Sequence, residues 1–457
     1  MPGTLPSTSL RRRSLIIGAG VATALLAAAC SPPGGGERSE TELAEITEPI
    51  TAEQIAELGD IELTVWAEAG EEETLDLFVP EFEDRYPNVD VQVSVRAIDD
   101  LVTTVVNALN SEDPPDVAQG NQGFGTDALL VEAGLLRPLE DVAEAYGWDE
   151  SFNDQLLGPL RWEDDGSQFR SGDLYGISPV ANNIGVFYNE EILQDAGVEI
   201  PSSLEEFEAA LEAVHDNGDL PIMLGNSEQW PALHVYGALL GAFADADEVN
   251  AWISGAEGAT FETDDNLAAA ERLARWAEQG YFGEAYNSVG IDDAAVRFGG
   301  GEAAFMVAGD WYAPAIIEGG GESFGFMAPP VGPSGSVASI GSVSFPWHIS
   351  ARTDVEAAAI AFVAEMNSPE NAPLLASVNR IPVNADVEPP GPMAADLVAV
   401  NDELMAADGQ IDYPDWATPN LYSIFGSELQ NLMDGRSEPE DFLAAVQLEW
   451  EDFHEAR

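Results

Sequence analysis

The stretch LYGISPVANNIGVFYNEEILQDAGVEIPSSLEEF, residues 174–207, carries the most information about the architecture of this chain. Near its end, Ser203 and Glu206 form the pattern of a capping box, in which two side chains satisfy free N–H groups at a helix start. Apolar side chains then recur at helical spacing, at Leu204, Phe207, Leu211 and Val214. The stretch therefore predicts an amphipathic helix that packs against a neighbouring layer.

Short strands alternate with helices on the N-terminal side of this stretch. IELTVWAEAG, residues 61–70, is typical of an apolar strand and a polar turn, and residues 75–82 carry apolar side chains at helical spacing. Four valines alternate over residues 89–95 and predict a half-buried strand. A helix, a turn marked by prolines, a short strand and a polar loop follow in the same way over residues 99–123. Strand–helix alternation predicts an α/β fold with sheets of parallel type.

Polar and aromatic side chains follow two of these predicted strands. In open α/β sheets, ligands bind outside the carboxyl ends of the strands. We therefore expect Trp66 and Glu68, after the first strand, to lie at the same rim of the sheet as Gln119, Asn121 and Gln122, after the other strand.

The N-terminal segment has the features of an export signal. Three arginines, residues 11–13, precede an uncharged stretch, residues 15–29, that is too short to span a bilayer comfortably. RRRSLI resembles a twin-arginine signal, and AAAC resembles a lipobox in which Cys30 becomes the lipidated first residue. Ala27 departs from that pattern, which favours leucine there, so a plain secretory signal with an incidental cysteine is the alternative. Residues 30–59 contain few bulky apolar side chains, and we expect a flexible tether.

Composition excludes several classes of function. The formal charge is −67, and the sixteen basic residues are all arginine, so no lysine is available for a Walker A motif or a Schiff base. Nucleic acid is excluded as a partner, because binding it depends on positive charge that neutralises phosphates. The four histidines are scattered, without the close spacing of metal ligands. We expect no metal and no cofactor.

The ordered segments resemble the extracellular solute-binding proteins of bacterial ABC sugar importers, the branch related to maltose-binding protein. Residues 174–207 carry the most specific likeness, with VFYNEEILQDAGVEIPSSLEEF, and FGGGEAAFMVAGDWY is nearly as specific. Further segments in the same order are LTVWAEAG, FEDRYPNVDVQV, PPDVAQGNQG, GSVSFPWHIS, RIPVN and MDGRSEPEDFLAAV.

The resemblance implies a type II periplasmic-binding-protein-like fold with two hinge-connected, discontinuous lobes and a ligand cleft between them. It implies a signal peptide over 1–29, a tether over 30–59, lobe 1 over 60–178 and 345–388, and lobe 2 over 179–340 and 389–457. The hinges are expected near 177–182, 341–344 and 385–395. Lobe closure buries the ligand, and a permease recognises the closed form.

The resemblance and the chemistry of sugars together predict a set of binding residues. Sugars stack their C–H faces on aromatic rings, and their hydroxyls need amide, carboxylate or guanidinium partners. The family places aromatic or polar cleft residues at Trp311, Trp230 and Tyr422. The full predicted set is Trp66, Glu68, Asn121, Gln122, Asn183, Glu228, Trp230, Asp310, Trp311, Ser342, Arg380 and Tyr422.

Each of these residues also has a structural alternative. A tryptophan can belong to the core, Asp310 can cap a helix, and Arg380 can form a surface ion pair. Trp347 is left open between cleft and core, because GSVSFPW departs from the family pattern.

The sequence thus predicts a monomeric, non-enzymatic receptor, exported and lipid-anchored to the outer face of the cytoplasmic membrane. We expect it to bind a sugar, in particular an oligosaccharide, and to deliver it to ABC permease subunits. The alternatives are a secreted glycoside hydrolase, whose paired carboxylates an acidic chain can supply by chance, and a receptor for a ligand other than a sugar.

Overall fold

The computed structural model describes residues 45–320 and 323–455. Residues 46–457 form one compact unit and residues 1–45 a separate unit. The predicted export signal, Cys30 and the predicted tether up to residue 44 lie outside the described residues. The unit 46–457 alternates helices with strands, which confirms the predicted α/β class.

Thirteen strands are present among the described residues, most of them short. They are β1 (Ile61–Glu68), β2 (Val89–Arg96), β3 (Val117–Gln119), β4 (Arg161–Trp162), β5 (Asp173–Leu174), β6 (Val180–Asn189), β7 (Leu220–Met223), β8 (Ala303–Gly309), β9 (Phe324–Met327), β10 (Ser339–Val343), β11 (Trp347–Ile349), β12 (Ile381–Pro382) and β13 (Gln410–Ile411).

The α-helices fall into two halves of the chain. Those before β7 are α1 (Ala52–Ala56), α2 (Glu72–Arg85), α3 (Ile98–Leu109), α4 (Asp127–Glu132), α5 (Glu140–Tyr146), α6 (Trp148–Ser151), α7 (Asp154–Leu157), α8 (Glu190–Ala196) and α9 (Leu204–Asn217). Those after β7 are α10 (Pro231–Phe243), α11 (Ala246–Ile253), α12 (Asp264–Glu278), α13 (Ile291–Gly299), α14 (Ala313–Gly320), α15 (Glu356–Met366), α16 (Ala372–Ser377), α17 (Pro392–Ala406), α18 (Leu421–Met433) and α19 (Pro439–His454).

The first sheet has the order β11-β3-β1-β2, and β1 runs parallel to both of its neighbours. Strand β11 pairs antiparallel with β3. The valine alternation of β2 is buried only in its first half, because Val93 and Val95 remain 37% and 38% exposed. Polar residues at the ends of β1 and β3 lie side by side in this sheet, since Val65 and Trp66 pair with Val117 and Ala118.

The second sheet has the order β13-β10-β6-β8-β7, and its pairing is mixed rather than of the expected parallel type. Strand β6 pairs antiparallel with β8, β9, β10 and β12. Parallel pairs occur between β7 and β8 and between β10 and β13. The departure arises because β6 collects strands that return from distant parts of the chain, rather than successive strand–helix–strand units.

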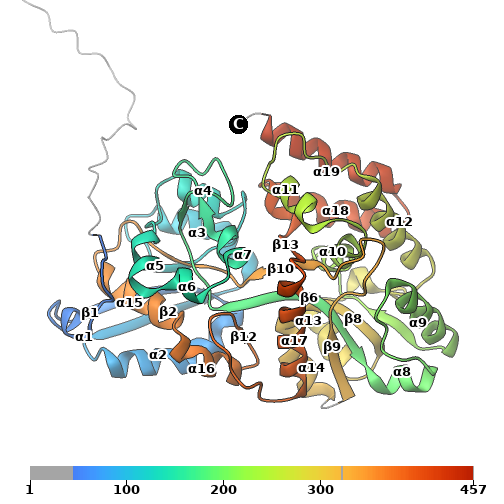
Figure 1. Ribbon diagram of the computed structural model, residues 1–457, viewed down its shortest axis with the longest axis horizontal. Helices are drawn as coiled ribbons and strands as arrows, with labels where there is room; N and C mark the ends of the chain where they lie inside the picture. Colours follow the sequence, from blue (N-terminus) through green and yellow to red (C-terminus); the bar gives the residue numbers. More distant parts are fainter. Residues whose placement is uncertain (1–44, 321–322, 456–457) are drawn as a thin grey trace, which may run out of the picture. The chain divides into compact units, whose positions relative to one another are not determined.

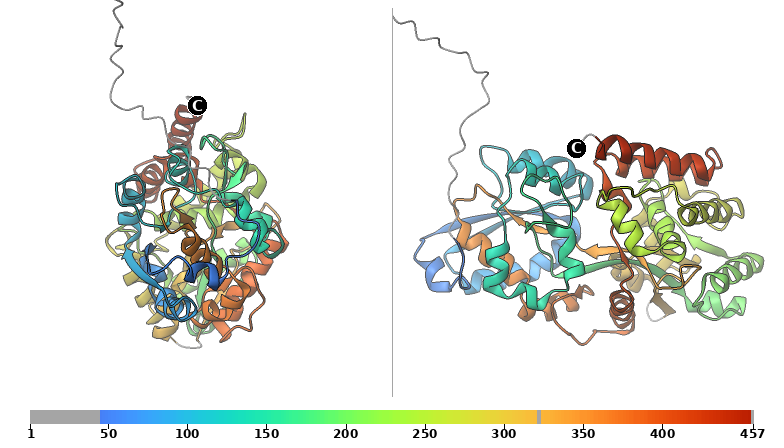
Figure 2. Two further views of the ribbon diagram at one scale, coloured as in Figure 1. Left: turned by 90° about the vertical axis from the view of Figure 1, so that its left-hand side faces the viewer. Right: turned by 45° about the horizontal axis from the view of Figure 1, so that its top comes forward.

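The chain passes between the two sheets three times. It leaves the first sheet before β6, returns between β10 and β11, and leaves again between β11 and β12. In Figure 1, β6 extends from the elements around the first sheet toward β8 and β9, and the right-hand view of Figure 2 shows the same course. Strand β12 pairs with the start of β6 at Ile381 and Pro382, and the chain reaches α17 at Pro392.

The first sheet packs against an aromatic core. Phe78 and Phe82 of α2 contact the ring of Phe362 of α15, at centroid distances of 5.2 and 5.3 Å. Trp347 packs against the same ring and is 1% exposed. Trp347, which the sequence left open between cleft and core, therefore belongs to the core.

The loop after β3 packs on a turn from the C-terminal part of the chain. The backbone N–H of Phe124 donates to the carbonyl oxygen of Trp416, at 2.9 Å, in the turn η7 (Pro414–Ala417). The Phe124 ring also lies 5.3 Å from Phe453 of α19. A Cβ atom on Gly123 would lie 2.3 Å from Cβ of Trp416, so this close approach requires glycine.

Two local expectations change in detail. The predicted tether extends too far, because α1 lies within it and Ile55 is fully buried against the first core. Ser203 caps α9 by accepting from the N–H of Glu206. The Glu206 carboxylate accepts from the backbone N–H and the hydroxyl of Ser202 instead of completing the capping box.

Across residues 45–320 and 323–455, no helix combines the length and apolar character that crossing a membrane requires.

Candidate functional site

The end of β1 carries the carboxylate of Glu68, which a backbone donor holds in place. Oε2 of Glu68 accepts from the N–H of Gly70 at 2.6 Å, and the N–H of Glu68 donates to Oε1 of Gln119 at 2.8 Å. Burial raises the pKa of Glu68, and the nearby charge of Glu71 adds to that increase. The ends of β1 and β3 thus form one rim, as the sequence predicts.

Glu71, three residues further on, forms a buried ion pair that the sequence did not reveal. It is 4% exposed and bonds Nη2 of Arg380, the residue before β12. Its Oε1 also accepts from the hydroxyl of Ser344 at 3.4 Å. Arg380 is thereby tied to the rim of the first sheet, rather than to a surface partner.

A second polar group lies where β6 meets β8 and β10. The backbone N–H of Asn183 donates to Oδ2 of Asp310 at 2.7 Å, and its side-chain N–H donates to Asn401 at 3.1 Å. Burial raises the pKa of Asp310 to about 7, although the backbone N–H groups of Asn183 and Trp311 and the charge of Arg380 act against the rise. Ser342 is 1% exposed, and its hydroxyl has no partner among the described residues. These side chains and Arg380, whose charge acts on Asp310, form a polar cluster.

Aromatic rings flank this cluster. Trp230 and Trp311 are both half-buried, and His234 lies between them, with ring centroids 5.0 Å from Trp230 and 5.6 Å from Trp311. Tyr413 also faces His234, at 6.3 Å. The structure therefore brings the two predicted stacking tryptophans onto one buried histidine.

Other predicted residues have different surroundings. The guanidinium of Arg96 lies 3.4 Å above the ring of Trp66 and occupies one face of it. Gln122 is 2% exposed and donates to the carbonyl oxygen of Val343, so it fastens the loop after β3 to β10. The Glu228 carboxylate accepts from the N–H of Ile291 at the start of α13.

Two predicted residues remain at the surface of the described chain. Asn121 is half-buried in the loop after β3. Tyr422 lies on α18 and is 46% exposed.

Three contributors were missed, Glu71, His234 and Tyr413. The spacing of Trp230 and His234, four residues apart, places both on one face of a helix, and this signal was available in the sequence. Glu71 had no such signal, because its partner Arg380 is 309 residues away.

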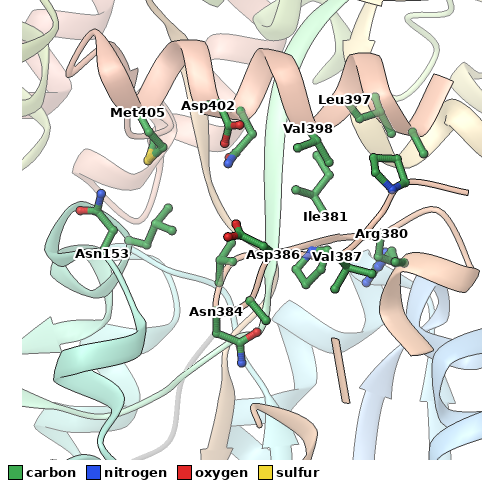
Figure 3. A pocket seen from close by; sticks show the side chains of 18 of the residues that line it. Asn153, Arg380, Ile381, Asn384, Asp386, Val387, Leu397, Val398, Asp402 and Met405 are labelled. Atoms are coloured by element: carbon green, nitrogen blue, oxygen red, sulfur yellow. The ribbon is translucent and has the colours of Figure 1, made fainter. Parts of the chain in front are cut away.

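A cavity of about 620 Å³ lies between α7, residues 379–390 and α17, and Asn401, the hydrogen-bond partner of Asn183, is among the residues that line it. Figure 3 shows Asp386 and Asp402 facing one another across it, with Ile381 and Val398 alongside. Among the predicted site residues, Arg380 alone lines this cavity. Within the described part of the chain, no three histidine, cysteine or acidic side chains are grouped so that they could hold a metal ion.

Comparison with known proteins places this geometry in context. Residues 78–400 match the family model for bacterial extracellular solute-binding proteins. An uncharacterized ABC transporter extracellular-binding protein of Pyrococcus horikoshii is 25% identical over 305 residues, which are 65% of this chain and 64% of that protein. A multiple sugar-binding protein of Streptococcus mutans is 24% identical over 185 residues, 39% of this chain and 44% of that protein. The matched region thus spans about two thirds or less of these relatives.

Among solved structures, a chitin oligosaccharide binding protein superposes with a TM-score of 0.75. The superposition covers 87% of this chain and 99% of that protein, at 21% sequence identity. The two-lobe fold is therefore shared.

Proposed function

Because the chain belongs to the family of bacterial extracellular solute-binding proteins, we propose that it captures a saccharide between its two lobes and delivers it to the permease of an ABC importer. The observation that carries this proposal is the pairing of Trp230 and Trp311 around His234, beside the polar cluster of Asn183, Asp310 and Arg380. Aromatic faces and hydroxyl partners are the two elements that sugar binding needs. The names of the Streptococcus relative and the chitin-oligosaccharide-binding structure support the same class of ligand.

The charge of the cluster favours a neutral sugar over an anion. Arg380 is neutralised by Glu71, and it lies within range of two further carboxylates, Glu68 and Asp310. An anionic ligand would meet this excess of negative charge, which disfavours its binding. Neutral hydroxyl groups avoid that repulsion and can donate to the carboxylates.

We also propose that the chain binds without turnover. Glycoside hydrolysis needs one protonated and one free carboxyl group on either side of the bond. Glu68, Glu71 and Asp310 are each engaged by donors of the protein, namely Gly70, Arg380 and Asn183. Release of reducing sugar from oligosaccharides would contradict this proposal.

Lobe movement is a further part of the proposal. The three passages between the sheets would act as hinges, with the first sheet in lobe 1 and the second in lobe 2. We propose that Trp66, Glu68 and Asn121 approach the ligand from lobe 1 and that Trp230, Trp311 and Tyr422 approach it from lobe 2. The exposure of Tyr422 suits a residue that becomes covered only when a ligand binds.

The proposal that the protein is anchored to the membrane rests on its N-terminal sequence. We propose export by the twin-arginine route and lipidation of Cys30, which would keep a monomeric receptor beside its permease. Two acyl chains hold a protein stably at a membrane, whereas one does not. Membrane fractionation of Cys30→Ala tests this, and unchanged association with the membrane would exclude the anchor.

Thermal-shift measurements test the binding role. The panel comprises chitotriose, maltotriose, xylotriose and raffinose, with sulfate and glutamate as anionic controls. A ligand at 100 times its Kd stabilises the native state by about 2.7 kcal/mol, which raises the melting temperature visibly. We expect at least one saccharide to do so and the anions to have no effect. A shift with glutamate or sulfate and none with any saccharide would overturn the proposal.

A further inference from the structure

His234 is a buried side chain with an unused hydrogen-bonding atom. It lies in the first turn of α10 and is 3% exposed. Its Nδ1 is buried and has no hydrogen-bond partner among the described residues. Buried polar atoms in folded proteins are nearly always paired. An unpaired one beside a binding site therefore indicates an atom reserved for a ligand.

Three separate chain segments converge on this imidazole. Trp230 precedes α10, Trp311 follows β8 in the turn η4 (Asp310–Tyr312), and Tyr413 precedes η7. The ring of Trp311 meets the imidazole edge-on, with an interplanar angle of 81°. Any saccharide that stacks on Trp230 or Trp311 would lie close to His234.

The chemistry of a neutral imidazole suits a hydroxyl group. Burial lowers the pKa of His234 to about 3, so the ring is uncharged at neutral pH. One ring nitrogen then donates and the other accepts. A sugar hydroxyl also donates and accepts, so it can bond either tautomer, whereas a carboxylate can only accept.

We propose that His234 determines specificity within the binding site, its Nδ1 sharing a hydrogen bond with one hydroxyl of a saccharide held against Trp230 and Trp311. This inference rests on the proposed sugar-binding function. It extends that function by assigning the recognition of a single hydroxyl to a residue beneath the stacking surface.

Three variants test the proposal by calorimetric titration with the member of the saccharide panel that binds wild type most tightly. His234→Phe retains a flat ring and removes both nitrogens. His234→Gln retains a donor and an acceptor. His215→Phe is the matched control, on the exposed part of α9 in the same lobe. We expect His234→Phe to weaken binding about tenfold or more, His234→Gln by about threefold or less, and the control not at all.

Monodeoxy analogues of the same saccharide separate recognition from packing. Wild type should lose affinity when one particular hydroxyl is removed, and His234→Phe should be indifferent to that hydroxyl while responding normally to the others. Equal responses of wild type and His234→Phe to every analogue would overturn the proposal, as would a His234→Gln variant that binds no better than His234→Phe. Failure of wild type to bind any saccharide would instead contradict the proposed function.

Discussion

Two buried histidines, one beside each sheet, have opposite surroundings. Nδ1 of His348 lies 2.8 Å from the carbonyl oxygen of Tyr175, and Nε2 lies 3.2 Å from Oδ1 of Asp127. Beside the second sheet, Nδ1 of His234 has no partner among the described residues. The difference indicates that the first histidine holds the fold together, whereas the second leaves bonding capacity for a ligand.

Glycines make the arrangement around His348 possible. A Cβ atom on Gly120 would lie 2.6 Å from Nε2 of His348, and one on Gly176 would lie 2.7 Å from Cε1. Burial alone would lower the pKa of His348, but the Asp127 carboxylate and the hydrogen bonds raise it above the ordinary value. The rim loop after β3 is thereby fastened to the passage before β6.

Removal of His348 should have the largest effect on stability. His348→Leu leaves the carboxyl group of Asp127, which is 1% exposed, without the imidazole whose Nε2 lies 3.2 Å from its Oδ1. Breaking a buried pair in this way costs about 3–5 kcal/mol. We expect a decrease of that size in the free energy of unfolding, measured by urea denaturation at pH 7 and fixed salt.

The matched variant beside the second sheet is His234→Leu. Nδ1 of His234 has no partner among the described residues to lose, so we expect a loss below about 1.5 kcal/mol from altered packing. The double variant Asp127→Leu/His348→Leu should recover part of the stability lost in His348→Leu, since no carboxylate is then left unpaired. Equal losses in His348→Leu and His234→Leu would remove the distinction between the two histidines.

Local patterns predicted the elements of the first sheet well. The periodicities of residues 61–68 and 75–82 depend on burial at local spacing, and both elements form where expected. The same patterns could not show that Val93 and Val95 stay exposed, because the covering of a sheet face is decided by distant segments. For the same reason the mixed pairing around β6 was not predicted.

Some residues of the candidate site could likewise be predicted from the sequence, and others could not. Trp230 and Trp311 could be named from residue type and family position, whereas His234 was missed although its spacing of four residues from Trp230 was available in the sequence. Glu71 was missed because its role depends on Arg380, whose position depends on the third passage between the sheets. Trp347 was undecided in the sequence because its neighbours in the core, such as Phe362, come from another segment.

Crowding the space around His348 should have a smaller effect than removing the pair. Gly120→Ala would place a methyl group 2.6 Å from both Oδ1 of Asp127 and Nε2 of His348. Overpacking of this kind costs about 1–3 kcal/mol, measured by the same denaturation. Gly391→Ala is the control, since a Cβ atom there meets nothing within 4 Å. A loss no larger than in the control would show that the His348 region is loosely packed.

Buried carboxylates extend the comparison to the pH dependence of stability. Asp415, in η7 beside Tyr413, has one oxygen without a partner among the described residues. Burial raises its pKa to about 7. In the unfolded chain the carboxyl group loses its proton near pH 4. Between these values the native state binds more protons than the unfolded state, so stability decreases as pH rises through this window.

Asp415→Asn removes this titration. The stability difference between wild type and Asp415→Asn should therefore change by about 1.3 kcal/mol per pH unit between pH 5 and 6 and by about half that slope at pH 7, with wild type losing stability relative to the variant. Urea denaturation of both proteins at several pH values and constant ionic strength measures the slope, and subtraction cancels the other acidic groups. A flat difference would mean that Asp415 ionises normally. Its surroundings would then be wetter than its exposure of 9% indicates.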